Sequence, residues 1–273
     1  MPTFATPEPI TATLVTGGAQ VRVAASERSD TVVRVEPINS ANNSNVKVAE
    51  RTKVDFSAGA LSIETVKAGD KSGSVAITVE LPVGSRLVLN TAWSEVRAEG
   101  PLGDCELEVL SGQIQLDHIA ALRGNLVAGG VAVGHVAGTV DLQGGAAQVR
   151  IGEVEGTVRY EGSTGRIWLG HALSDVDLSG ATGSFDIDRA EGGVVAKAAN
   201  CPIRIGRLTS GPADLTNAAG GIEVGISEGA GASVDADSTK GTVRNSVPAH
   251  ENGSQVKVYA RTRRDDIVIH RAV

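Results

Sequence analysis

Three histidines and a glutamate recur at one position of an internal repeat, and these side chains are the clearest candidates for metal chemistry. The four residues are His118, His135, Glu153 and His171, spaced 17 or 18 residues apart. Imidazole and carboxylate groups both suit Zn²⁺. Stacked strands lie about 4.8 Å apart, however, which is slightly long for one ion to be shared by more than two repeats. Because Arg189 and Arg207 continue the series, a solvated corner that accepts any polar residue is the competing interpretation, and we expect no bound metal.

A second recurring position carries a tryptophan among charged residues. Its members include Arg150, Trp168, Asp186 and Arg204. Opposite charges on neighbouring strands contribute about 0.2–1 kcal/mol each, and an arginine beside a tryptophan adds a cation–π contact. We expect Trp168 to be the one large apolar side chain pointing outward, which makes these four residues a candidate protein-contact surface. The alternative is that they only stabilise the sheet.

No arrangement of residues points to catalysis. The two cysteines are Cys105 and Cys201, and Cys201 occupies a position where other repeats have glycine or alanine, as expected of a small buried side chain. Asp117 and Asp188 replace turn glycines, which makes them poor candidates for a glycoside-cleaving carboxylate pair. The sequence predicts no enzyme, no cofactor and no small-molecule substrate.

The repeat that positions these residues runs from Ser111 to Val243. Its core is an apolar residue, any residue, a second apolar residue, then Gly or Asp. The copies begin at Ile114, Val131, Val149, Ile167, Phe185, Ile203 and Ile222, 17 to 19 residues apart. This period is too short for the common helical repeats. It predicts an all-β fold, a single β-solenoid with rungs of about 18 residues and two short strands in each rung.

The regions outside the repeats predict strands that cap this solenoid at both ends. We divide one elongated domain into an N-terminal strand region (1–86), the repeats (87–247) and a C-terminal loop with capping strands (248–273). Alternating apolar residues predict the additional strands. These span residues 10–14, 20–24, 31–35, 61–65, 75–81, 255–260 and 266–270. We expect residues 39–45 and 67–74 to be exposed loops and 49–53 to form a helical turn.

Composition restricts the partners and the compartment. The net charge is −7 and only 3% of residues are aromatic. Because no basic run is longer than Arg263–Arg264, nucleic acids and anionic membranes are not expected partners. The chain lacks a stretch of 18 apolar residues and a recognisable secretory signal, so we predict a cytoplasmic protein, with the cell surface by an unrecognised route as the alternative.

Several segments resemble a bacterial β-strand-repeat family of unknown function that is often labelled "putative adhesin". They are the opening residues 1–10, the segment Val79–Ser85, the Gly-any-Ile/Val-any-Ile/Val-Gly units, residues 243–245 and the closing residues 261–269. The resemblance covers nearly the whole chain and implies a β-solenoid with no established activity. Many family copies carry an Asp before the first apolar residue of each unit. Here Gln113, Gly130, Gln148, Arg166, Ser184 and Pro202 stand there instead.

We therefore predict a non-enzymatic scaffold or protein-interaction module whose partner is another protein. The first alternative is a self-assembling subunit that resembles bactofilins, in which exposed end rungs pair to build a filament. The second alternative is an adhesin-like structural subunit.

Overall fold

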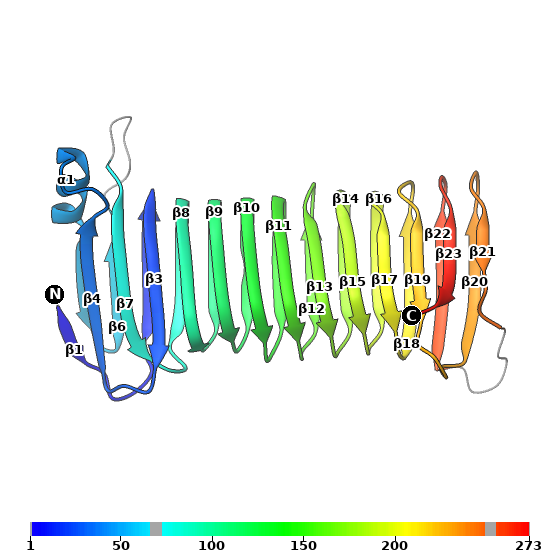
Figure 1. The fold of residues 1–273 in the computed structure, drawn as a ribbon, viewed down its shortest axis with the longest axis horizontal. Coiled ribbons are helices and arrows are strands. Elements are labelled where there is room, and N and C mark those ends of the chain that lie inside the picture. The colour runs from blue at the N-terminus through cyan, green and yellow to red at the C-terminus, as the bar shows by residue number, and fades with distance from the viewer. Residues whose placement is uncertain (1, 66–72, 249–254, 273) are drawn as a thin grey trace. The chain divides into compact units, whose positions relative to one another are not determined.

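A computed structural model describes residues 2–65, 73–248 and 255–272. Its strands confirm the all-β class, and the one helix in these ranges is α1 (Asn43–Arg51). The chain divides into two compact units, Met1–Ala137 and Gly138–Val273, whose strands are labelled in Figure 1. The predicted loop at 67–74 lies almost entirely outside the described residues.

Three long parallel strands form the regular part of the first unit. They are β8 (Arg86–Leu102), β9 (Cys105–Ile119) and β10 (Leu122–Val136). Leu87 pairs with Cys105, and Cys105 pairs with Leu122, so equivalent residues stand 18 and 17 positions apart. Each is one continuous strand that turns a corner, where the sequence predicts two short strands. At one corner, a Cβ on Gly129 would lie 2.2 Å from the carbonyl oxygen of Gly112, so this close approach requires glycine.

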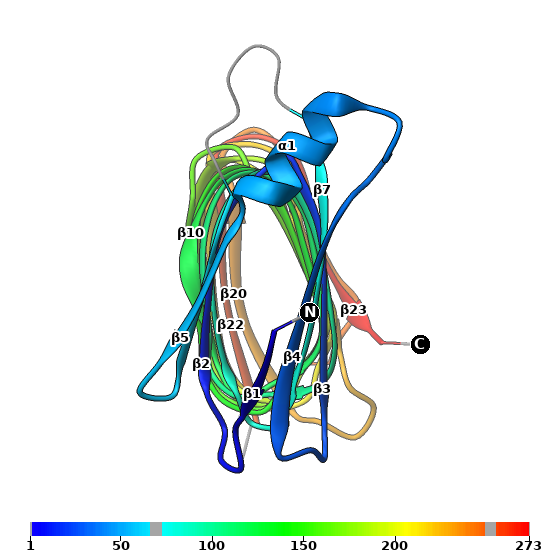
Figure 2. The ribbon, with the colours of Figure 1, turned by 90° about the vertical axis from the view of Figure 1, so that its left-hand side faces the viewer.

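Antiparallel strands cover the N-terminal end of the first unit. The strands β2 (Thr11–Gly17) and β3 (Ala19–Ser26) lie between β8 and the pair β6 (Ala60–Glu64) and β7 (Val75–Pro82). Beyond these, β5 (Lys53–Ser57) pairs with β6, β4 (Asp30–Pro37) pairs with β7, and β1 (Thr3–Ala5) pairs with β4. Figure 2 shows β2 and β5 on one wall and β3 and β4 on the facing wall. The stacked rings of Phe4 and Phe56, 4.8 Å apart, join β1 to β5 and cover the apolar interior here.

Helix α1 is longer than the predicted turn at 49–53 and replaces part of the predicted loop at 39–45. Asn42 caps it, accepting a hydrogen bond from the backbone N–H of Ser44 at 2.9 Å. Asn45 is buried and accepts a hydrogen bond from the Ser74 N–H at 2.8 Å. The helix contacts β4 and β7, which explains why a polar local sequence becomes ordered. Nowhere in the described ranges does a helix have the length and apolarity to cross a membrane.

The second unit repeats a two-strand pattern in parallel. Its strands are β11 (Val140–Val154), β12 (Val158–Gly162), β13 (Arg166–Ala172), β14 (Val176–Thr182), β15 (Ser184–Ala190), β16 (Val194–Asn200), β17 (Ile203–Leu208), β18 (Gly211–Asn217), β19 (Ile222–Ile226), β20 (Ala232–Ser238), β21 (Val243–Asn245), β22 (Val256–Thr262) and β23 (Ile267–Arg271). The structure pairs Val140, Val158, Val176 and Val194 in sequence, and all four are at most 2% exposed. These stacked aliphatic side chains form the core that the repeat predicts.

Tyr160 is the largest side chain in this core. It lies between Leu142 and Leu178, and its ring meets Phe185 edge to face with centroids 6.4 Å apart. A Cβ on Gly165 would lie 2.0 Å from the Tyr160 hydroxyl oxygen, so this glycine makes room for the phenol. The hydroxyl has no hydrogen-bond partner in the part of the chain that the structure describes. Burial raises the pKa of Tyr160.

The C-terminal strands lie inside the stack, which corrects the prediction that residues 248–273 form its outer cap. Strand β22 pairs with β18 on one side and with β20 on the other, while β23 pairs with β19 and β21. Leu215 therefore pairs with Ala260, and Ala260 pairs in turn with Ala236. The repeat spacing predicts instead that Val234 is the next residue after Leu215 in the stack. Within the described residues, β20 and β21 each pair along one edge only, and Val243 is 41% exposed at this end.

Candidate interaction surface

Six side chains on three neighbouring strands form a shallow groove in the second unit. Gln148, Arg166 and Ser184 pair across β11, β13 and β15, and two residues further along Arg150, Trp168 and Asp186 pair in the same way. The six residues line a hollow of about 250 Å³, which we call the Trp168 groove. The sequence supplies this arrangement because alternate residues of a strand point to one face and the repeat brings equivalent positions together.

Trp168 is fixed in the groove by charged neighbours. Its indole Nε1–H donates to Asp188 Oδ2 at 3.2 Å, and the Arg150 guanidinium carbon lies 5.4 Å from the ring centroid. Asp188 Oδ1 accepts from Arg204 at 3.1 Å. Gly170 leaves room for the indole, because a Cβ there would lie 3.1 Å from its edge. Trp168 is therefore only partly exposed, whereas the sequence predicts a side chain pointing freely outward.

The structure brings the four predicted contact residues together in two ways. Arg150, Trp168 and Asp186 line the groove, while Arg204 lies beside it and is held by Asp188. Sequence reasoning missed both Asp188, which it assigned to a turn, and Arg166. The signal for Arg166 was available, since it stands two residues before Trp168 and alternate residues of a strand share one face.

The cations of the groove are available to a ligand. Arg150 and Arg166 are both exposed, and neither forms an ion pair with any residue that the structure describes. Asp186 is the one carboxylate among the residues that line the groove. It lies on β15, whereas Arg150 lies on β11 on the other side of Trp168. The groove therefore has a cationic side over β11 and β13 and an acidic side over β15.

An exposed apolar ridge in the first unit was not predicted. Trp93 is 73% exposed, and it bulges out of β8 with the left-handed backbone torsion φ +52°. Leu110 and Val127, at the corners of β9 and β10, are 58% and 48% exposed. Leu110 and Val127 occupy adjacent positions, because the residues that precede them, Val109 and Leu126, pair with each other. We call these three residues the Trp93 ridge. Its sequence signal is three large apolar residues at corners, where the second unit has small residues such as Gly145, Ser163 and Ala181.

The predicted metal column divides between the two units. In the first unit, the rings of His118 and His135 lie 5.7 Å apart, and His118 Nδ1 is 3.1 Å from Asp117. In the second unit, His171 Nδ1 is 3.1 Å from Glu153 Oε2 and its Nε2 is 3.0 Å from Glu191 Oε1. Both ring nitrogens of His171 thus face carboxylates. Among the described residues, no three His, Cys, Asp or Glu side chains converge as metal ligands.

Both cysteines are free and buried. Burial raises the pKa of Cys105 to about 12 and that of Cys201 to about 11. A thiol with so high a pKa carries almost no thiolate near neutral pH, which is the reactive form. Their chemistry agrees with the predicted role of Cys201 as a small core side chain.

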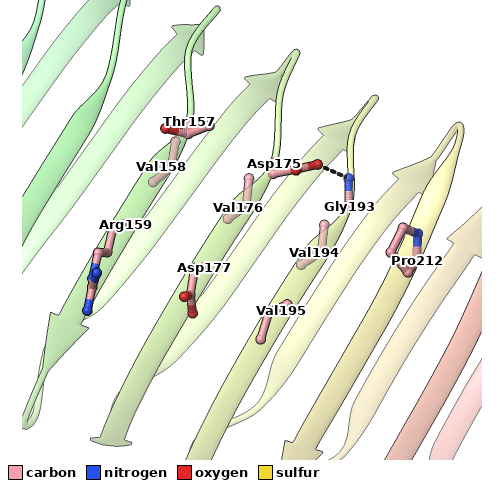
Figure 3. Close-up of a pocket in the computed structure, with 10 residues that line it drawn as sticks. All are labelled: Thr157, Val158, Arg159, Asp175, Val176, Asp177, Gly193, Val194, Val195 and Pro212. Atoms are coloured by element: carbon pink, nitrogen blue, oxygen red, sulfur yellow. Dashed lines mark hydrogen bonds between the residues drawn. The ribbon is translucent and has the colours of Figure 1, made fainter.

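Two further hollows have no aromatic side chain in their lining. The hollow drawn in Figure 3 measures about 340 Å³ and lies over β12, β14, β16 and β18, where the Asp175 carboxylate accepts a hydrogen bond from the Gly193 N–H at 2.7 Å. Its floor is apolar, with Val158, Val176 and Val194. A hollow of about 360 Å³ in the first unit includes Arg97 and Glu99, which pair with each other at 2.9 Å.

Comparison with known proteins gives similarities of structure only. No protein-family model matches the chain, and a search of curated proteins finds no match. A putative adhesin from Parabacteroides distasonis is 12% identical over 98% of this chain and 95% of its own, with a TM-score of 0.45. A putative adhesin from Parabacteroides merdae is also 12% identical, over 98% and 94% of the two chains, with a TM-score of 0.46. Both neighbours are named putative adhesins, the name that the sequence resemblance also carries.

Proposed function

We propose that the chain is a β-solenoid that serves as a non-enzymatic protein-interaction module and binds its partner through the Trp168 groove. Parallel pairing at offsets of 17 to 19 residues supports the solenoid. A stack of this kind has a continuous core and changes shape little on binding. It is therefore suited to holding side chains on its surface in fixed positions.

The observation that carries the proposal is the fixed tryptophan within a concave set of polar side chains. Binding sites combine a hollow with a few convergent polar groups, and tryptophan and arginine are the residues most enriched at energetic hot spots. Trp168 is held at its indole nitrogen by Asp188 and over its ring by Arg150, so little conformational entropy is lost on binding. The Trp93 ridge exposes more apolar area, but it lies outside the three hollows described above.

Capture with matched variants tests this function. Immobilised wild-type chain, Trp168→Ala and Trp93→Ala are incubated with native lysate, and proteins retained by each are quantified by mass spectrometry. The proposal expects a protein retained by wild type and Trp93→Ala and lost with Trp168→Ala, with the same order of affinities when that protein is purified. Loss with Trp93→Ala alone would assign the interaction to the ridge and refute the groove.

Among the described residues, β20 and β21 each leave one edge unpaired, which favours self-association as a second candidate function. An unpaired strand edge is a template for another strand, whereas the opposite end of the sequence forms antiparallel strands closed by the Phe4–Phe56 stack. This difference favours a dimer through β20 and β21 over a filament. Light scattering against concentration distinguishes them: growth into large assemblies supports the filament, a limiting dimer supports edge pairing, and a constant monomer contradicts both.

We retain the cytoplasm as the proposed location, with the cell surface as the alternative that an adhesin-like role requires. Protease accessibility on intact cells distinguishes the two. Protection of the chain until the cells are lysed supports the cytoplasm, and cleavage on intact cells supports the surface.

A further inference from the structure

We infer that the Trp168 groove binds an extended acidic peptide segment with carboxylates at alternate positions. This inference rests on the proposed function and specifies the chemistry of the partner. Its basis is the position of two guanidinium groups beside a fixed indole, with Arg150 opposite Trp168 on β11 and Arg166 two residues before Trp168 on β13.

The spacing of the two arginines sets the spacing of the ligand. Arg166 on β13 pairs with Gln148 on β11, and Gln148 stands two residues before Arg150 on β11. Neighbouring strands are about 4.8 Å apart and two residues of a strand span about 6.6 Å, so the two arginine backbones lie about 8 Å apart on a diagonal. Side chains at positions i and i+2 of an extended peptide share one face and stand about 6.8 Å apart. Two carboxylates so placed can each reach one guanidinium.

The chemistry of the groove selects carboxylates over uncharged groups. Arginine presents a planar fork of donors that binds a carboxylate bidentately, and clusters of arginine are a recurring device for recognising acidic motifs. Arg150 already lies against the face of Trp168, so its guanidinium is partly oriented before a ligand arrives. The indole edge offers apolar surface to the methylene groups of a glutamate.

Asp186 fixes the direction in which such a segment can lie. It pairs with Trp168 on the side opposite Arg150 and would repel a carboxylate placed over β15. The acidic residues must therefore sit over β11 and β13, with a neutral or basic partner residue near Asp186. The Trp93 ridge differs in charge, since Glu95 stands two residues after Trp93 on β8 and Glu108 stands two residues before Leu110 on β9.

The two tryptophans allow a direct measurement. In a Trp93→Phe chain, Trp168 is the only tryptophan, so intrinsic fluorescence reports on the groove alone. The probe is an acetylated octapeptide in which Glu and Thr alternate, and its control is a block peptide of the same composition, Glu-Glu-Thr-Thr-Glu-Glu-Thr-Thr, in which no two Glu stand at positions i and i+2. We expect a saturable change in Trp168 emission with the alternating peptide, at least fivefold tighter than with the block peptide and weaker at high salt.

Variants of single cations identify the contacts. In the Trp93→Phe background, Arg166→Gln should weaken binding about tenfold, as loss of a charge-assisted hydrogen-bonded pair implies. Arg166→Lys should retain part of the affinity. Arg159→Gln is the matched control, because it makes the same charge change at an exposed site on β12 outside the groove. Circular dichroism confirms that each variant is folded.

The results that overturn the inference are distinct from those that overturn the proposed function. No emission change at millimolar alternating peptide, equal response to both peptides, or equal loss in Arg159→Gln and Arg166→Gln would reject the acidic segment. Tighter binding of a phosphopeptide or a short single-stranded DNA would also reject it. If a captured protein still depends on Trp168 in any of these cases, the interaction function stands and only the carboxylate chemistry fails.

Discussion

Replacing Tyr160 by phenylalanine is expected to stabilise the second unit. The substitution keeps the ring, its edge-to-face contact with Phe185 and its place between Leu142 and Leu178, and removes only a hydroxyl that is buried without a described partner. Leaving a buried hydroxyl unsatisfied costs about 1–3 kcal/mol. We take the low end and expect Tyr160→Phe to raise the free energy of unfolding by about 1 kcal/mol, which corresponds to a rise in Tm of about 3 °C.

The matched comparison is Tyr160→Leu, which gives the residue that neighbouring repeats carry. It removes the hydroxyl too, but it also empties the corner that Gly165 leaves for the phenol. The cavity and the lost aromatic contact should outweigh the gain and lower stability by about 2 kcal/mol. Calorimetry and urea unfolding followed by circular dichroism measure both variants. A loss of stability in Tyr160→Phe would refute the reasoning and show that the hydroxyl is hydrogen-bonded, for example to a buried water.

Three further predictions concern other regions. Trp93→Gly should raise the free energy of unfolding by up to about 1 kcal/mol, because glycine adopts the φ of +52° without strain; a loss above 1 kcal/mol in urea unfolding would show that the exposed indole packs instead. The hydrogen bond from His171, aided by Arg189, lowers the pKa of Glu191. The folding stability that the ionised Glu191 contributes is therefore fully present above about pH 4.5 and is lost as the pH falls through the lowered pKa of the folded state. The drop in Tm between pH 5 and 3 should be smaller in Glu191→Gln, and an equal drop would contradict this. Cys105 and Cys201 should resist thiol reagents at pH 8 until the chain is unfolded, and rapid labelling of the native chain would contradict their burial.

The sequence predicts the strands and much of their pairing because two local signals agree. Alternating apolar residues identify each strand, and the constant repeat length sets which residues become neighbours, as for Val158 and Val176. The order of the terminal strands does not follow from these signals. Nothing local in Val256–Thr262 indicates that it pairs between β18 and β20, since its alternation suits an outer or an inner position equally.

The candidate site was predictable in outline and not in detail. The repeat places Arg150, Trp168 and Asp186 side by side, as the structure has them. The sequence assigns Asp188 to a turn, whereas it lies within β15 and its side chain reaches across to the indole on β13, a contact that spacing alone does not specify. The exposure of Trp93 depends on a local bulge in β8 that shifts the register by one residue, and a repeat pattern has no means of indicating such a shift.

Whether the partner binds through the Trp168 groove is tested most directly by the affinity of a purified captured partner for three forms of the chain. Isothermal titration calorimetry compares wild type, Trp168→Ala and Trp93→Ala at one salt concentration. We predict at least tenfold weaker binding for Trp168→Ala and an unchanged Kd for Trp93→Ala, as expected when one hot-spot aromatic is removed. Equal affinity of Trp168→Ala and wild type would contradict the assignment of the interaction to the Trp168 groove.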